Sequence, residues 1–339
     1  MKIIKKYLLL SLLSLTIVLT ASKCKDDEET PLVGNWVELN SLPGDNRSFA
    51  ASFVIGDLAY IGTGRINNDY LTDFWCYDPA TNDWTQIADF PGSGRIGAVG
   101  FGADSKGYVG TGTNSLVKYK DFYAYDPAAH TWSPIDDFAG TAREGAVAFV
   151  VNDIGYVGTG YDNSYTKDFY SYNPSTDEWT QIKYYSGDKR SYAVSFVIDG
   201  IGYVCTGQEN GSVKDDFYKY DPATDNWTAL RRIRDVSDEG YDNAYTIVRE
   251  RAAAFTINGK GYVTTGYNAG LKNDTWEYNP DEDRWYAKTS FEGSNRQGAC
   301  AFTLAGRGFV IAGGSGNLTT GYYGDIWEFM PDDTYNEDD

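Results

Sequence analysis

A pattern that recurs six times between residue 47 and the end of the chain constrains the fold more than any other feature. Each copy opens with Arg and a short apolar stretch, and continues with an aromatic residue, an apolar pair and a Gly-x-Gly-like element. Arg95 follows Arg47 by 48 residues, and a period of about 20–50 residues is typical of solenoids and propellers. The arginines that open the copies are Arg47, Arg95, Arg143, Arg190, Arg251 and Arg296.

Each copy predicts four short strands. In the first copy we expect strands over residues 50–55, 59–62, 73–77 and 84–87. Tyr (28 residues) and Gly (37 residues) are abundant, and they suit half-buried pleated surfaces and tight turns. A Tyr and a Trp recur in the second half of the copies, and we expect them to fill the space between neighbouring units. The sequence therefore predicts an all-β propeller of four-stranded antiparallel blades.

The end of the repeat array predicts how the ring closes. The sixth copy has no Trp after Phe329, whereas a spare Trp36 precedes Trp84 by 48 residues. We therefore expect the N-terminal strand to complete the last blade, which leaves no open sheet edge and fixes the number of blades at six. The glycine that ends the second strand is interpreted as Gly64 in the first copy and Gly314 in the sixth.

The repeated motif resembles the kelch family. The resemblance rests on elements such as Gly62-Thr63-Gly64, on Tyr77, and on Trp84 seven residues later, and it covers residues 32–330. It implies a six-bladed kelch-type β-propeller. Ligand-binding kelch domains often contact acidic ligands through arginines at matching positions. A bacterial periplasmic kelch propeller that interconverts sialic acid anomers is also similar, and it gives a catalytic interpretation a precedent.

The first 23 residues predict a signal peptide, because lysines precede an apolar run over residues 7–19 that is too short to span a bilayer. Cys24, followed by an acidic run, resembles the start of a bacterial lipoprotein and the surface-export signal of Bacteroidota-type lipoproteins. We expect an exported outer-membrane or cell-surface lipoprotein anchored at Cys24. Lys23 stands where such signals usually carry Gly, Ala or Ser, so the alternative is cleavage after Ser22 and a soluble periplasmic protein. The predicted organisation is a signal peptide over 1–23, a lipid-anchored acidic tether over 24–31, the propeller over 32–330 and an acidic tail over 331–339.

The formal charge of −19 disfavours nucleic acid and anionic lipid headgroups as partners. The expected partner is a glycan or an envelope protein, the membrane is contacted by the lipid anchor only, and the propeller is expected to be monomeric.

One face of the propeller is predicted to bind. Because the strands alternate in direction, the loops between second and third strands lie on the same face as the connections between copies, around the channel mouth. Those loops are rich in Tyr, Asn, Ser and Gly, as adaptable binding surfaces are, and an insertion over 233–250 lies on the same face. The alternative for the arginines is structural: each pairs with an acid or a strand-end carbonyl of the next blade. The candidate ligand-binding residues are Arg47, Arg95, Arg143, Arg190, Arg251, Arg296, Tyr70, Tyr161, Tyr165 and Tyr267.

Several kinds of chemistry are absent from the sequence. His130 is the one histidine, so a Ser-His-Asp triad, a multi-His metal site and the two-His copper site of galactose oxidase are excluded. Cys76, Cys205 and Cys300 are scattered and are interpreted as small buried hydrophobes. We expect neither a cofactor nor a metal.

Carboxylate chemistry remains open. Glu144, Glu209 and Glu250 are candidates for a general base, or are counter-ions of the arginines. The favoured function is non-catalytic binding of a ligand or protein on the cell envelope. The alternatives are a mutarotase, epimerase or lyase acting on an acidic sugar, and a scaffold that docks envelope proteins.

Overall fold

The computed structural model describes residues 32–234, 245–316 and 321–336, which belong to one compact unit, Leu32–Asp339. The predicted signal peptide, the tether and its Cys24 lie outside the described residues. No helix in the described ranges is long and apolar enough to cross a membrane.

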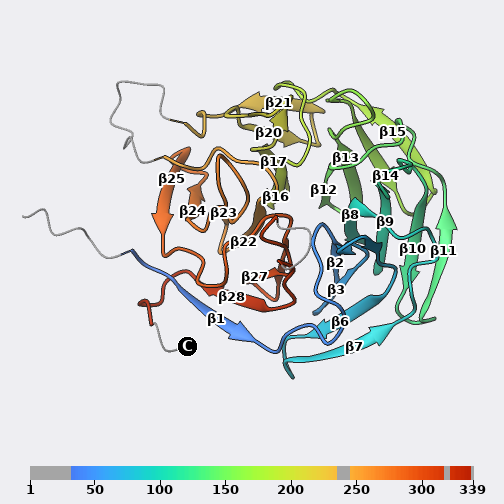
Figure 1. The fold of residues 1–339 in the computed structure, drawn as a ribbon. Coiled ribbons are helices and arrows are strands. Elements are labelled where there is room, and N and C mark those ends of the chain that lie inside the picture. The colour runs from blue at the N-terminus through green and yellow to red at the C-terminus, as the bar shows by residue number, and fades with distance from the viewer. Residues whose placement is uncertain (1–31, 235–244, 317–320, 337–339) are drawn as a thin grey trace, which may run out of the picture. The chain divides into compact units, whose positions relative to one another are not determined.

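Six four-stranded antiparallel sheets surround a central axis as blades (Figure 1). Within each blade we name the strands a to d from the axis outward. Blade 1 has β2 (Ala51–Ile55), β3 (Leu58–Gly62), β6 (Phe74–Asp78) and β7 (Asp83–Ile87). Blade 2 has β8 (Ile96–Ala103), β9 (Lys106–Thr113), β10 (Phe122–Asp126) and β11 (Thr131–Ile135). Blade 3 has β12 (Val147–Val151), β13 (Ile154–Gly158), β14 (Phe169–Asn173) and β15 (Glu178–Ile182).

Blade 4 has β16 (Val194–Ile198), β17 (Ile201–Cys205), β20 (Tyr218–Asp221) and β21 (Asn226–Ala229). Blade 5 has β22 (Ala253–Ile257), β23 (Lys260–Thr264), β24 (Thr275–Asn279) and β25 (Arg284–Lys288). Blade 6 has β26 (Cys300–Leu304), β27 (Arg307–Ile311), β28 (Ile326–Met330) and β1 (Asn35–Leu39). Two small hairpins extend the b–c loops of blades 1 and 4: β4 (Arg65–Ile66) with β5 (Asp69–Tyr70), and β18 (Gln208–Glu209) with β19 (Ser212–Val213). The predicted six-bladed, four-stranded architecture is confirmed.

The N-terminal strand closes the ring, as predicted. β1 lies beside β28 and pairs antiparallel with it (Figure 1). Trp36 lies opposite Phe329 in this pairing. Trp36 is fully buried, and its ring centroid lies 4.9 Å from that of Phe291 and 4.7 Å from that of Phe329. A strand from the start of the chain therefore supplies both the last edge of blade 6 and part of its aromatic core.

Aromatic side chains fill the spaces between blades. Phe53 stacks on Tyr60 within blade 1, with 4.9 Å between ring centroids. The two rings reach blade 2, where Phe53 meets Trp132 edge-on and Tyr60 lies 5.6 Å from Tyr125. This confirms that the recurring Tyr and Trp pack between blades. Among the cysteines, Cys205 and Cys300 are buried and free, while Cys76 is half-buried and free.

The arginines that open the repeats are structural in every blade, and we call them the latch arginines. Their side chains are fully buried, and each is ion-paired with an aspartate at the start of strand c. The aspartate belongs to the same blade, and not to the next blade as the structural alternative expected. The pairs are Arg47–Asp73, Arg95–Asp121, Arg143–Asp168, Arg190–Asp216, Arg249–Asp274 and Arg296–Asp325. The ligand-binding prediction is therefore wrong for Arg47, Arg95, Arg143, Arg190 and Arg296, because none of their donors faces solvent. In blade 5 the latch is Arg249, not Arg251.

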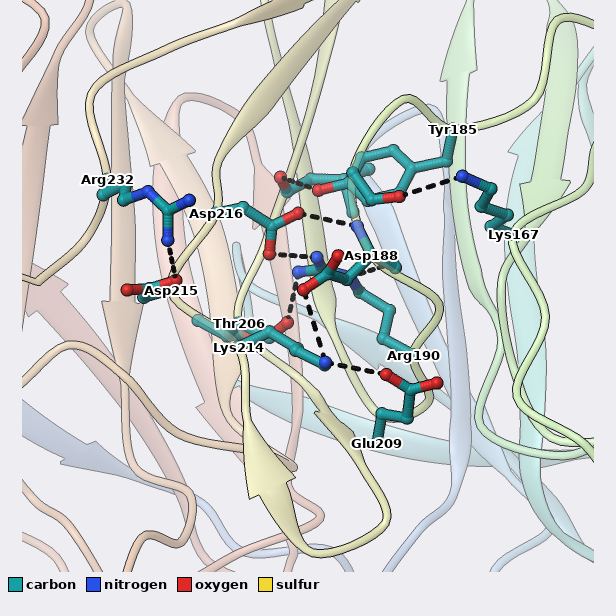
Figure 2. A network of polar contacts seen from close by, with 12 residues as sticks. Lys167, Tyr185, Asp188, Arg190, Thr206, Glu209, Lys214, Asp215, Asp216 and Arg232 are labelled. Atoms are coloured by element: carbon teal, nitrogen blue, oxygen red, sulfur yellow. Dashed lines mark hydrogen bonds and ion pairs between the residues drawn. The ribbon is translucent and has the colours of Figure 1, made fainter.

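Figure 2 shows the latch of blade 4. Arg190 is paired with Asp216, its Nη1 donates to the carbonyl oxygen of Thr206 at 2.8 Å, and its Nε donates to that of Asp188 at 3.1 Å. The guanidinium carbon lies 4.8 Å from the centre of the Tyr185 ring. One side chain thus joins the d–a connection, the end of strand b and the start of strand c.

The backbone of each latch arginine joins its blade to the preceding one. Gly64 N, at the end of strand b in blade 1, donates to the carbonyl oxygen of Arg95 in blade 2 at 2.8 Å. Gly64 has φ +87°, and a Cβ there would lie 2.9 Å from the carbonyl oxygen of Ser48, so the position requires glycine. The equivalent glycine of blade 6 is Gly313, whose N donates to the carbonyl oxygen of Arg47, and not Gly314 as interpreted from the sequence.

Arg95→Met is expected to lower the free energy of unfolding by about 3 kcal/mol, because the substitution leaves the half-buried carboxylate of Asp121 and the buried carbonyl of Thr111 without their donor. Chemical denaturation of the full chain measures the change. Arg284→Met removes the same charge from an exposed position and is the matched control, with an expected effect below about 1 kcal/mol. Equal small effects of both substitutions would contradict the latch.

The latches also predict loss of stability in acid. Burial alone would raise the pKa of Asp325, but hydrogen bonding and the charge of Arg296 outweigh it and hold that pKa below its ordinary value. The same balance, with burial opposed by Arg47 and by Arg249, lowers the pKa of Asp73 and of Asp274. A lowered pKa in the folded state stabilises the fold above the unfolded pKa of about 3.9. This stabilisation is lost as pH falls through the folded pKa.

Denaturation of wild type and Asp325→Asn between neutral pH and pH of about 2.5 tests this balance. The stability difference between the two proteins should be largest above the unfolded pKa and shrink in stronger acid. A difference that stays constant over the whole range would contradict the assignment.

Candidate functional site

Arg251 occupies a different position from the latches. It lies two residues after Arg249, at the channel mouth on the face of the b–c loops and d–a connections, and its side chain is 31% exposed. The equivalent residues of blades 1 and 4 are Phe49 and Tyr192. The guanidinium carbon of Arg251 lies 5.7 Å from the centre of the Phe49 ring and 5.2 Å from that of Tyr192. The two rings meet edge-on, with 5.7 Å between centroids.

The polar contacts of Arg251 leave part of its guanidinium free. Nη1 donates to Gln297 Oε1 at 3.0 Å, and Nε lies 3.5 Å from Glu250 Oε2. Nε is buried and has no hydrogen-bond partner within the described residues. The guanidinium group of Arg251 stacks on two aromatic rings and still has donors that a ligand's acceptor atom can use.

Arg251 lines a cavity of about 200 Å³. Arg65, at the start of the small β4–β5 hairpin, lines it from blade 1. Arg65 is half-buried, its Nε is inaccessible to solvent, and its side chain makes no hydrogen bond or ion pair in the described ranges. The cavity is lined by Ser48, Phe49, Arg65, Ile96, Tyr192, Arg251, Gln297, Gly314, Gly316, Gly321 and Tyr322. Two arginines therefore converge on one small cavity with two aromatic rings.

The three candidate acids each have a cation beside them. Glu144 accepts a hydrogen bond from Tyr192 Oη at 2.8 Å and lies 3.8 Å from Lys118 Nζ. Glu209 accepts a hydrogen bond from Lys214 Nζ at 2.8 Å (Figure 2). Burial raises the pKa of Glu250, and the neighbouring charge of Arg251 opposes the rise. Each of the three glutamates therefore lies where it can act as a counter-ion of a neighbouring Lys or Arg.

Burial, followed by the charge of Glu144 and the hydrogen bond to it, raises the pKa of Tyr192. Tyr192 therefore stays a neutral hydrogen-bond donor at ordinary pH. Because its hydroxyl group donates to Glu144, Tyr192 contributes its ring, and not its oxygen atom, to the lining of the cavity.

The four predicted tyrosines lie on the b–c loops, but none of them lines the cavity. Tyr70 pairs its hydroxyl with Ser115 Oγ. Tyr161 packs on Tyr165, with 5.0 Å between ring centroids, and Tyr165 is paired with Gln208. Tyr267 is 39% exposed. Their role in binding stays a prediction.

The sequence interpretation missed Arg65, Phe49, Tyr192 and Gln297. A usable signal existed for Phe49 and Tyr192: the second residue after the latch is glycine in blades 2, 3 and 6 and bulky in blades 1, 4 and 5. Within the ranges that the structure describes, no group of three or more His, Cys, Asp or Glu residues could hold a metal ion.

Comparisons with known proteins agree with the repeat and the ring of blades. The chain carries a kelch motif. The match to the kelch motif family covers residues 46–91, which is most of blade 1. Of the solved structures, 818 chains match this fold. One of them, titled "Structure of YjhT", has a TM-score of 0.68 and 19% sequence identity, over 85% of this chain and 96% of that chain. No curated protein sequence matches the chain. At this identity the likeness shows the fold alone.

Proposed function

We propose that this kelch propeller binds a small anionic ligand in the cavity at its channel mouth and performs no chemistry on it. The observation that carries the proposal is Arg65, a half-buried cation without a side-chain partner in the described residues, which lines the same cavity as the half-satisfied Arg251. A buried donor without a partner is unfavourable, and a carboxylate accepts from a guanidinium in two parallel hydrogen bonds.

The rest of the cavity supports a ligand with an apolar side as well as a carboxylate. Phe49 and Tyr192 offer aromatic surface, and Ser48 and Gln297 offer short polar groups beside it. A volume of about 200 Å³ is below the range of drug-sized pockets, so the ligand or the ligand group that enters is small. An acidic monosaccharide, or the acidic end of a glycan, has this combination of properties.

Binding is favoured over catalysis by the state of the acids. A general base on a sugar needs a carboxylate that faces the cavity without an ion-pair partner. Glu144, Glu209 and Glu250 each lie beside a cation, and none of them lines the cavity.

Isothermal titration of the full chain with D-glucuronate and with D-glucose tests the proposal, since the two sugars differ in one carboxylate. We expect D-glucuronate to bind and D-glucose to bind at least tenfold more weakly. Arg65→Met should weaken D-glucuronate binding by at least tenfold, because one guanidinium–carboxylate contact is worth about 1.5–3 kcal/mol.

Arg284→Met, which removes the same charge outside the cavity, is the matched control and should bind as wild type does. D-galacturonate and N-acetylneuraminate extend the panel. If no acidic sugar binds the wild type, the small-anion proposal is wrong and a protein partner on the same face becomes the function to test.

We further propose that the chain is exported and held at the envelope by a lipid on Cys24, where its partner is a glycan or another envelope protein. The support is the basic and apolar start of the sequence and the acidic run that follows Cys24.

Detergent phase partition of a bacterial host that expresses the full chain, combined with mass spectrometry of the N-terminal peptide, tests the anchor. Wild type should enter the detergent phase with a lipid on Cys24, and Cys24→Ala should enter the aqueous phase. Wild-type protein that is cleaved after Ser22 and stays aqueous would support the soluble periplasmic alternative instead.

A further inference from the structure

Six backbone hydrogen bonds form a closed ring across the channel mouth. The second residue after each latch arginine donates its N–H to the carbonyl oxygen of the equivalent residue in the preceding blade. We call these six residues the mouth ring. The N···O distances are 3.1 Å for Gly97 to Phe49, 2.9 Å for Gly145 to Gly97, 2.8 Å for Tyr192 to Gly145, 3.0 Å for Arg251 to Tyr192, 2.9 Å for Gly298 to Arg251 and 2.8 Å for Phe49 to Gly298.

The mouth ring requires a backbone conformation that suits glycine. All six residues have positive φ: 56° at Phe49, 62° at Gly97, 61° at Gly145, 52° at Tyr192, 57° at Arg251 and 62° at Gly298. Three blades use glycine there, and three carry a bulky residue in a conformation that is strained for side chains with a Cβ. Because three blades close their hydrogen bonds with glycine, the side chains at the other three are not needed to make the ring.

The glycines and the bulky residues are complementary in space. A Cβ on Gly145 would lie 3.1 Å from the ring of Tyr192, and one on Gly298 would lie 2.8 Å from the ring of Phe49. The glycines thus leave room for two aromatic rings to lie across the mouth, and Arg251 packs on both rings.

The mouth ring also separates two cavities along the channel. We call the cavity lined by Arg65 and Arg251 the upper cavity. In blade 1, Ser48 and the mouth-ring residue Phe49 line the upper cavity, and Ala50 lines a lower cavity of about 210 Å³. In every blade the lower cavity is lined by the alanine that follows the mouth-ring residue and by the next two residues of the chain. Of the mouth-ring residues, Phe49, Tyr192 and Arg251 line the upper cavity, so these three residues bound it on the side of the mouth ring.

We propose that Phe49, Tyr192 and Arg251 are the specificity-determining residues of this propeller, and that the mouth ring is a fixed backbone platform on which they are placed. The ligand class that they select is a carboxylate attached to a ring with an apolar face: the face rests on Phe49 and Tyr192, and the carboxylate meets Arg251. This inference rests on the proposed function, and Arg65 provides the means to separate the two.

Three variants of the full chain test the inference: Arg251→Gly, Gly145→Ala and Arg65→Met. Melting temperature and affinity for D-glucuronate and D-glucose are measured for each. Arg251→Gly installs the residue that three blades already use and removes strain at positive φ, but it leaves Glu250 without its counter-ion. Its melting temperature should therefore lie close to that of wild type and well above that of Arg95→Met. Its affinity for D-glucuronate should fall at least tenfold, and its preference for D-glucuronate over D-glucose should fall with it.

Gly145→Ala should lower both the melting temperature and the affinity, because its Cβ adds strain at positive φ and presses on the Tyr192 ring. A melting temperature of Arg251→Gly that drops as far as that of Arg95→Met would overturn the inference, since Arg251 would then be structural. If Arg65→Met abolishes D-glucuronate binding while Arg251→Gly binds as wild type does, the proposed function stands and the role of the mouth ring is overturned. If the wild type binds no acidic sugar, both fail together.

Discussion

The buried ion pair between a latch arginine and the aspartate of strand c is the interaction on which the rest of the propeller depends. The guanidinium group donates hydrogen bonds to the aspartate and to two backbone carbonyl oxygens of its own blade. The backbone carbonyl oxygen of the same arginine accepts a hydrogen bond from a glycine N–H of the preceding blade. In four blades the guanidinium also stacks on a buried aromatic ring of the d–a connection, as Arg95 does on Phe90 at 4.8 Å. One residue per blade therefore connects three segments of its own blade and the blade before it. Desolvating six arginines is unfavourable in itself, so their retention reflects the complete set of partners that each one finds.

Because the latches fix where each chain segment passes the channel mouth, they also fix the residues that follow. The mouth ring lies two residues beyond the latch in every blade, and its hydrogen bonds close only if all six latches stand in register. The scaffold and the candidate site are thus adjacent in sequence but separate in role. Latch residues are the same in all blades, whereas mouth-ring side chains differ between them. In a repeat protein, function resides where the copies differ, and here the differences in the mouth ring are confined to Phe49, Tyr192 and Arg251.

Much of the fold could be predicted from the sequence, because the repeat and the displaced Trp36 specify the number of blades and the closure. The period alone could not identify the latch arginine of blade 5. The insertion over 233–250 changes the spacing to the preceding copy, and the segment Arg249-Glu250-Arg251 contains two candidate arginines. A second spacing resolves the choice. In every blade the guanidinium bonds the carbonyl of the residue 16 positions further on. Arg249 keeps this spacing to Thr265, and Arg296 keeps it to Ala312, which also assigns the following glycine as Gly313. The cavity itself could not be predicted, because Arg65 belongs to a b–c loop whose sequence is not repeated.

The negative charge of the chain favours a ligand that carries few negative charges. A formal charge of −19 repels anions at long range, yet the latch arginines are neutralised by their aspartates and contribute little to the mouth. Arg65 and Arg251 differ in that the described residues do not complete their hydrogen bonding. An extended polyanion carries many charges, and the acidic surface repels each of them. A ligand with one carboxylate carries a single negative charge, and in the cavity this charge lies close to two guanidinium groups, where screening by salt is weak. The acidic surface and the cationic cavity together therefore favour a single carboxylate over a densely charged partner.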